Sequence, residues 1–124
     1  MFKFNNTEPI YIQLVDLFKL KIVSGEWRCG SRMPSVRDLA LEYGINPNTM
    51  QRAMSELERE ALVRTESTNG RFITSDKALI KAERDRLAQK EVAYFIGRME
   101  AIGCSREEIT ELIKKFEEST KEEM

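Results

Sequence analysis

The side chains best suited to contact another molecule lie close together in one short run of the chain. Asn46, Asn48 and Thr49 are small and polar, and at a helix N-terminus such residues let the exposed N–H groups approach a phosphate. Gln51 and Arg52 follow and can reach base edges, because Gln pairs with adenine and Arg with guanine through two hydrogen bonds. The chemistry that this run predicts is recognition of a DNA groove.

Two flanking positions could add contacts. Arg37 stands near the start of a short predicted helix, where it either contacts the DNA backbone or pairs with Asp38 or Glu42; we predict the DNA contact. Gly70 and Arg71 belong to a predicted turn whose tip would lie along the minor groove. The basic residues here are arginines, whose planar fork suits phosphate or guanine better than lysine does.

Capping signals predict two short helices on either side of Gly44. The first, at residues 36–43, begins after Ser35, which resembles the start of a capping box, and the glycine ends it. The second begins with Asn46 as its N-cap and Pro47 at its first position. An apolar stripe is expected along this second helix, formed by Met50, Ala53, Met54, Leu57 and Ala61.

The neighbouring segments complete a domain. Residues 10–24 carry apolar side chains at helical spacing, and residues 62–65 and 71–74 are β-like runs around an Asn-Gly turn. Two helices with a tight turn, followed by a hairpin, form a winged helix-turn-helix. We therefore expect a mainly α fold with a small β-hairpin, in which residues 1–75 form a DNA-binding domain that starts with a loose leader at residues 1–8.

The pattern of residues 76–124 predicts two C-terminal helices, which we expect to form a dimerisation region. A long helix at 77–102 and a final helix that frays after Glu117 each carry an apolar stripe at helix–helix spacing. The stripes are formed by Ala88, Val92, Phe95, Met99, Ile102, Ile109, Leu112, Ile113 and Phe116. They could pack on the chain's own winged helix, but we predict packing on a second copy, because two helices without a core need burial elsewhere. Alternatively, Tyr94 and Phe95 could line a small-molecule site at that interface.

Composition narrows the function. The net charge is −1, with +1 on residues 1–75 and −2 on residues 76–124, so DNA binding must come from a few arginines on one face. The chain has no histidine, and its two cysteines, Cys29 and Cys104, are far apart. We therefore expect no enzyme, no metal and no cofactor. A winged-helix module that binds protein instead of DNA is the alternative.

Targeting signals and spanning segments are also absent from the sequence. No N-terminal signal peptide and no apolar run of membrane-spanning length is present. We expect a cytoplasmic protein without membrane contact. The sequence leaves open whether a small-molecule effector binds, and the region after the wing is too short to predict an enclosed pocket.

Over residues 9–75 the chain resembles the GntR family of bacterial transcription regulators. The matching segments are Pro-Ile-Tyr-Ile-Gln-Leu at 9–14, Ile-Val-Ser-Gly-Glu-Trp at 22–27, Gly-Ser-Arg-Met-Pro-Ser-Val-Arg-Asp-Leu-Ala at 30–40, Gly-Ile-Asn-Pro-Asn-Thr at 44–49, Ala-Met-Ser-Glu-Leu-Glu at 53–58 and Gly-Arg-Phe at 70–72. The short C-terminal part is similar to that of the YtrA-type branch, whose members dimerise through it. The resemblance implies a regulator, more often a repressor, of a transporter operon; we expect it to bind an inverted-repeat operator as a homodimer.

The family's DNA contacts would carry over to six positions: Arg37, Asn46, Asn48, Thr49, Gln51 and Gly70. Pro47 departs from the pattern, because many relatives place a basic or polar residue there. One possible contact is therefore lost, and we do not carry the family's operator preference over to this chain.

Overall fold

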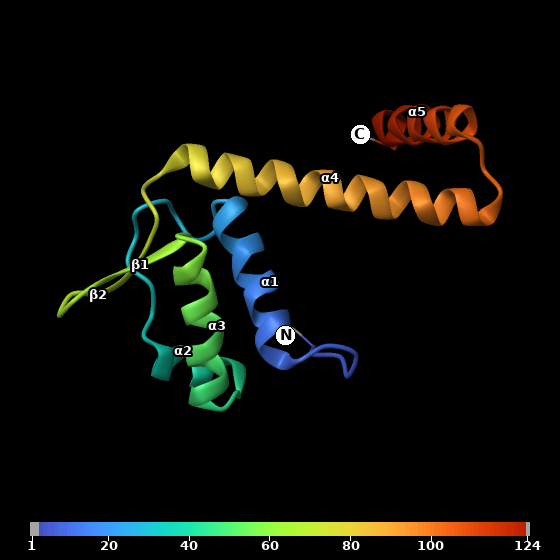
Figure 1. Cartoon of the computed structure of the whole chain (residues 1–124). Helices are drawn as coiled ribbons and strands as arrows, with labels where there is room; N and C mark the ends of the chain where they lie inside the picture. The colour runs from blue at the N-terminus through green and yellow to red at the C-terminus, as the bar shows by residue number, and fades with distance from the viewer. Residues whose placement is uncertain (1–2, 124) are drawn as a thin grey trace. The chain divides into compact units, whose positions relative to one another are not determined.

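The computed structural model describes residues 3–123, which form a mainly helical chain with a two-stranded antiparallel sheet (Figure 1). The elements, in chain order, are α1 (Ile10–Val23), α2 (Val36–Tyr43), α3 (Pro47–Arg59), β1 (Val63–Glu66), β2 (Gly70–Ile73), α4 (Lys77–Ile102) and α5 (Arg106–Glu123). This order confirms the predicted fold class. The chain divides into two compact units after Arg84, within α4. None of the helices among the described residues is long and apolar enough to cross a membrane.

The core of the first unit lies between α1, α2, α3 and the hairpin. Phe18 of α1 and Met50 and Leu57 of α3 have no exposed surface. The Phe18 ring centroid lies 4.9 Å from that of Trp27 and 5.7 Å from that of Tyr43. Burial of one large apolar side chain contributes about 1.5–3 kcal/mol, so this cluster fixes how α3 packs on α1. The polar side of α3 is left outside the core.

The predicted helix caps on either side of Gly44 are present. Ser35 Oγ accepts a hydrogen bond from the Asp38 N–H at 3.1 Å, and Asn46 Oδ1 accepts one from the Asn48 N–H at 2.8 Å. Gly44 has φ 65°, a left-handed conformation that is unfavourable for residues with a Cβ. The caps and the turn of the helix-turn-helix are therefore formed by Ser35, Gly44 and Asn46, the residues on which its prediction was based.

The hairpin differs slightly from its predicted extent, because both strands lie one residue nearer the turn. The Asn69 N–H donates to the Glu66 carbonyl at 2.7 Å. Gly70, at φ +99°, then pairs directly with Glu66. The ladder therefore continues into the tight turn instead of stopping before it.

A third segment supports the hairpin. The Met33 N–H donates to the Arg71 carbonyl at 2.8 Å, and the Ile73 N–H donates to the Ser31 carbonyl at 2.8 Å. Since β2 is bonded to β1 on its other edge, it has backbone partners on both sides. This arrangement fixes the main chain of Arg71 relative to the helices.

The prediction that Ala61 belongs to the apolar stripe of α3 is wrong. The helix ends at Arg59, and Ala61 is exposed with φ 63°. The Leu62 N–H donates to the Leu57 carbonyl at 3.0 Å and the Ala61 N–H donates to the Glu58 carbonyl at 2.9 Å, which is the Schellman ending of a helix. This turn places Leu62 in the core, whereas the other four predicted members of the stripe are buried as expected.

Ala61→Gly is expected to stabilise the fold. A residue with a Cβ destabilises the left-handed conformation by about 1–2 kcal/mol. Glycine removes this strain, but its greater entropy in the unfolded chain lowers the stability of the fold by about 0.5–1 kcal/mol. We expect the free energy of unfolding in urea to rise by about 0.5–1 kcal/mol. Ala53→Gly, inside the same helix, is the control and should lower it by about 1 kcal/mol or more. A fall for Ala61→Gly would contradict the prediction.

The N-terminal segment is more ordered than the predicted loose leader. Gln13 of α1 is buried, at 5% exposure, and its amide is satisfied by that segment. Gln13 Nε2 donates to the carbonyls of Asn5 and Glu8 at 3.0 and 2.8 Å, and the Asn5 N–H donates to Gln13 Oε1 at 2.9 Å. A buried amide without such partners would be costly. Residues 1 and 2 of the predicted leader lie outside the described residues.

A buried lysine joins three elements of the first unit. Lys19 of α1 has a side chain that is 8% exposed, and its Nζ lies 2.8 Å from Glu60 Oε1 and 3.3 Å from Glu83 Oε1. Glu60 follows the last residue of α3, and Glu83 lies in α4. The ionic cluster thus ties the end of the helix-turn-helix to the long helix that follows the wing.

The second unit consists of the rest of α4 and α5. Ser105 begins α5 with a reciprocal capping box: its Oγ accepts from the Glu108 N–H at 3.2 Å, and its N–H donates to Glu108 Oε1 at 3.1 Å. The predicted fraying after Glu117 is not seen, since α5 continues to Glu123. Ile109 is buried within its own chain, at 4% exposure.

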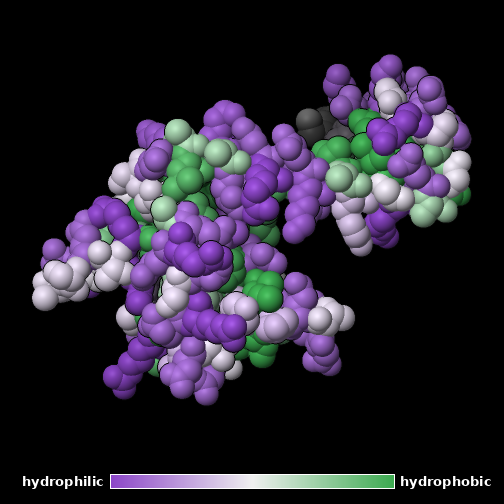
Figure 2. Space-filling model, viewed as in Figure 1, coloured by the Kyte–Doolittle hydropathy of each residue, from purple (hydrophilic) through white to green (hydrophobic). Residues whose placement is uncertain are grey.

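Much of the apolar surface of this second unit is uncovered. Figure 2 shows hydrophobic residues at its surface. Val92, Phe95, Leu112 and Ile113 are 42–54% exposed, and Ile102 and Phe116 are 76% and 72% exposed. Residues of α4, together with Arg106, line an open groove of about 530 Å³.

Candidate nucleic-acid interface

The N-terminus of α3 is presented to solvent. Asn46 and Asn48 are exposed, Thr49 is half-buried, and Pro47 occupies the first helical position. The Oδ1 atom of Asn46 accepts the hydrogen bond of the helix cap, so the first role of this side chain is to stabilise the start of α3. Pro47 has no N–H and the Asn48 N–H is used in the cap, so it is chiefly the positive end of the helix dipole that makes the terminus a suitable neighbour for a phosphate.

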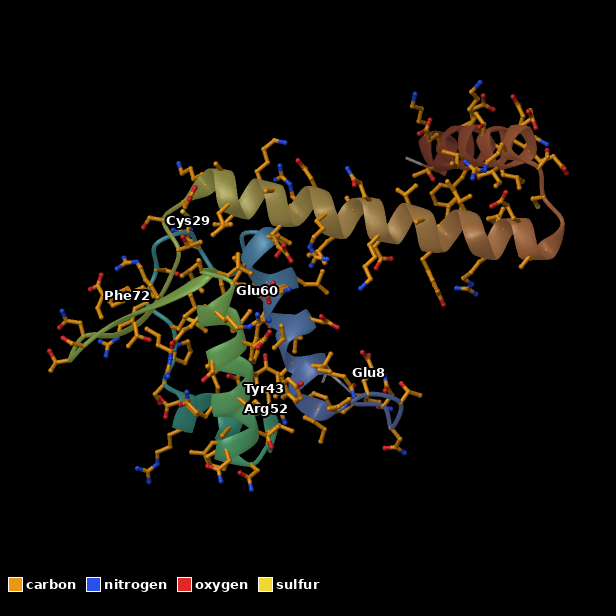
Figure 3. All side chains as sticks on the ribbon, in the orientation of Figure 1. Glu8, Cys29, Tyr43, Arg52, Glu60 and Phe72 are labelled. Carbon is orange, nitrogen blue, oxygen red and sulfur yellow. The ribbon has the colours of Figure 1, made fainter. Side chains whose placement is uncertain are left out.

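The two predicted base-reading side chains, Gln51 and Arg52, point to different neighbours. Arg52 is exposed and stacks on Tyr11 of α1, with its guanidinium carbon 3.8 Å from the ring centroid. Stacking on the ring uses the face of the guanidinium and leaves its N–H edges available. Figure 3 shows Arg52 in the N-terminal half of α3 and Glu60 just after its C-terminal end. Arg52, Asn48 and Thr49 line one groove of about 450 Å³ with α1.

Gln51 instead belongs to a network that reaches the wing. Arg71 Nη2 donates to Gln51 Oε1 at 3.4 Å, and Arg71 Nε donates to Glu58 Oε1 at 2.6 Å. Thr65 of β1 donates through Oγ1 to the same Glu58 oxygen at 2.6 Å. Burial raises the pKa of Glu58, but the hydrogen bonds from Thr65 and Arg71 outweigh it and hold the pKa below its ordinary value. Glu58 is therefore an anion at neutral pH.

Arg37 is exposed on α2. Among the residues that the structure describes, neither Asp38 nor Glu42 forms an ion pair with it, so the alternative considered from the sequence is not realised. Three other arginines form local ion pairs, namely Arg59–Glu56, Arg64–Glu66 and Arg71–Glu58. The charge of Arg37 remains available to a phosphate.

Gly70 has a structural reason to be glycine. Its φ of +99° is unfavourable for other residues, and an added Cβ would lie 3.2 Å from Arg32 Nε. Arg32 was not predicted as a site residue, yet it lines a groove of about 220 Å³ with Ser35, Gly70 and Arg71. Its position in the segment that pairs with β2 could be found only from the tertiary structure, because no local pattern marks that pairing.

The predicted site residues therefore fall into neighbouring groups on one unit. The α3 terminus and Arg52 lie beside α1, Gln51 and Arg71 lie between α3 and the wing, and Arg37 is exposed on α2. A capped helix-turn-helix with an exposed polar second helix and an anchored hairpin defines a winged-helix DNA-binding protein.

The chain belongs to the gntR family of bacterial regulatory proteins, whose family model matches residues 10–73. The HTH-type transcriptional regulator YhcF of Bacillus subtilis is 35% identical over 116 residues, which cover 94% of this chain and 96% of that protein. The HTH-type transcriptional repressor YtrA of the same organism is 29% identical over 117 residues, which cover 94% of this chain and 90% of that protein. A GntR family regulator from Listeria monocytogenes has a solved structure that superposes with a TM-score of 0.83 at 35% identity, covering 90% of this chain and 98% of that one. Relatives and fold are those of transcription regulators and not of enzymes, as the sequence predicted.

Proposed function

We propose that this regulator is a repressor that binds an inverted-repeat operator as a homodimer. The observation that carries the proposal is the outward-facing polar side of α3, whose terminus and polar residues are exposed while the apolar stripe packs in the core. In a dimer the two recognition helices would enter successive major grooves, separated by about 34 Å or a multiple of it. The similarity to YtrA of Bacillus subtilis, which is a transcriptional repressor, supports repression as the direction of regulation.

The DNA contacts proposed here divide by their chemistry. Arg37 and the α3 terminus suit phosphates, and Gln51 and Arg52 suit base edges. Gly70 and Arg71 suit the backbone and minor groove beside the wing. The full proposed set is Arg37, Asn46, Asn48, Thr49, Gln51, Arg52, Gly70 and Arg71.

Residues 1–75 would act as the DNA-binding domain and residues 76–124 as the dimerisation region. The exposed apolar side chains of α4 and α5 support this division, because exposed patches of this kind favour association. Dimerisation doubles the phosphate contacts of a chain whose net charge is only −1. We further propose a cytoplasmic location and a transporter operon as the target.

A selection of duplexes from a random DNA pool tests the proposal. The purified protein should enrich an inverted repeat. Arg37→Ala should weaken binding to all sequences and flatten the salt dependence of the dimer by about two units of slope, one for each protomer. Arg59→Ala, which removes an arginine already paired with Glu56, is the control and should leave both unchanged. A protein that binds no duplex at low ionic strength would contradict the proposal and favour the alternative, a protein-interaction module, which the near-neutral charge supports.

A further inference from the structure

The network between α3 and the wing constrains a base-reading side chain more tightly than its exposure suggests. Gln51 is exposed, yet both ends of its amide have partners: Oε1 accepts from Arg71 Nη2 at 3.4 Å, and Nε2 donates to Ser55 Oγ at 3.2 Å. A guanidinium has donors only, so the oxygen and not the nitrogen of the amide must face Arg71. The orientation of the amide is thus decided by the wing.

Arg71 is itself held in place. Its Nε donates to Glu58 Oε1 at 2.6 Å, and the two side chains are 23% and 32% exposed. Thr65, directly opposite Arg71 in the hairpin, donates to the same carboxylate oxygen at 2.6 Å. The Arg71 carbonyl accepts from the Met33 N–H at 2.8 Å. Main chain and side chain are therefore both anchored.

After these two hydrogen bonds, the Gln51 amide still has the acceptor and the donor with which a glutamine can bind adenine. An amide oxygen has two lone pairs and an amide nitrogen has two hydrogens. Arg71 and Ser55 use one of each. One acceptor and one donor remain, which is the pair that a glutamine presents to the N6 and N7 atoms of adenine.

We propose that Arg71 is a positioning residue for Gln51: anchored on Glu58, it orients the Gln51 amide for base readout before DNA binds. The proposal rests on the proposed DNA-binding function. It adds to the contact proposed above for Arg71 a role in specificity, since three of the five guanidinium donors are not engaged by Glu58 and Gln51. Sequence preference at one base pair then depends on a residue that need not touch it.

The test compares variants on the duplex selected by the wild-type protein and on its single base-pair variants, at two salt concentrations. Gln51→Ala first identifies the base pair whose preference is lost. Arg71→Lys keeps the charge but removes the guanidinium fork, and it should lower the preference at that same base pair by about 5-fold or more. Glu58→Gln should do so more weakly. In Arg71→Lys, which keeps the charge, the salt slope and the preference at other positions should stay unchanged.

Two comparisons make the result decisive. In a Gln51→Ala background, Arg71→Lys should have no further effect at that base pair, because the oriented side chain is gone. Arg64→Lys, in β1 and paired with Glu66, is the matched control and should leave the preference intact. The inference would be overturned by additive effects of Gln51→Ala and Arg71→Lys at that base pair, or by a uniform loss of affinity that leaves the preference at that base pair unchanged.

A readout without DNA separates this inference from the proposed function. The side-chain amide resonances of Gln51, assigned in the free protein by comparison with Gln51→Ala, should shift in Arg71→Lys and not in Arg64→Lys. If the protein bound no duplex, the proposed function would fail. Unmoved Gln51 resonances would instead overturn the inference, whether or not DNA is bound.

Discussion

Phe116→Glu, combined with Val92→Glu, is expected to convert a dimer into monomers and to lower affinity for a two-half-site operator by about 10²–10⁴-fold. Phe116 and Val92 are 72% and 54% exposed in the single chain. A charge at either position therefore has water around it in the monomer and little effect on folding. In a dimer the same charge would be buried without a partner, which is strongly unfavourable.

The measurements for this prediction are sedimentation and operator binding. Affinity for a single half-site should be nearly unchanged, because the substitutions lie outside the first unit. Leu20→Glu is the matched control: Leu20 is an apolar residue of α1 with 56% exposure, and its replacement should preserve both the dimer and operator affinity. A variant that stays dimeric would refute the assignment of this surface.

Lys19→Met is expected to lower the free energy of unfolding by about 3 kcal/mol. The lysine side chain is 8% exposed and faces both Glu60 and Glu83. Without it, Glu60 and Glu83 both lose the ammonium group that lies beside them near the core. Removing one member of a buried ionic cluster is costly for this reason, whereas replacing all its members with neutral residues need not be.

Two comparisons identify the cause of that loss. Lys21→Met, in the same helix, removes a more exposed pair with Glu26 and should cost less than about 1 kcal/mol. Adding Glu60→Gln and Glu83→Gln to Lys19→Met should recover much of the stability, since the negative charges that Lys19 balanced are removed. Urea unfolding measures all of these; equal losses for the Lys19 and Lys21 variants would contradict the argument.

Local chemistry made most of the fold predictable. The caps at Ser35 and Asn46, the glycine stop at residue 44 and the Asn-Gly turn act within a few residues, so their residue types alone indicated where α2, α3 and the wing begin or end. Ala61 shows the limit of this approach. Its apolar side chain fits the helical period, but the hydrogen bonds that end the helix place this side chain at the solvent-exposed surface.

The contacts that organise the proposed interface could not be predicted in this way. Arg71 and Gln51 are 20 residues apart, and Lys19 and Glu60 are 41 apart. Which polar side chains meet at such separations depends on how the helices and the wing pack. The sequence by itself determined the winged helix-turn-helix, its polar recognition helix and the exposed arginine on α2. Only the tertiary structure decided that Arg52 stacks on Tyr11 and that Arg71 reaches Gln51, because packing of the core brings distant polar groups together.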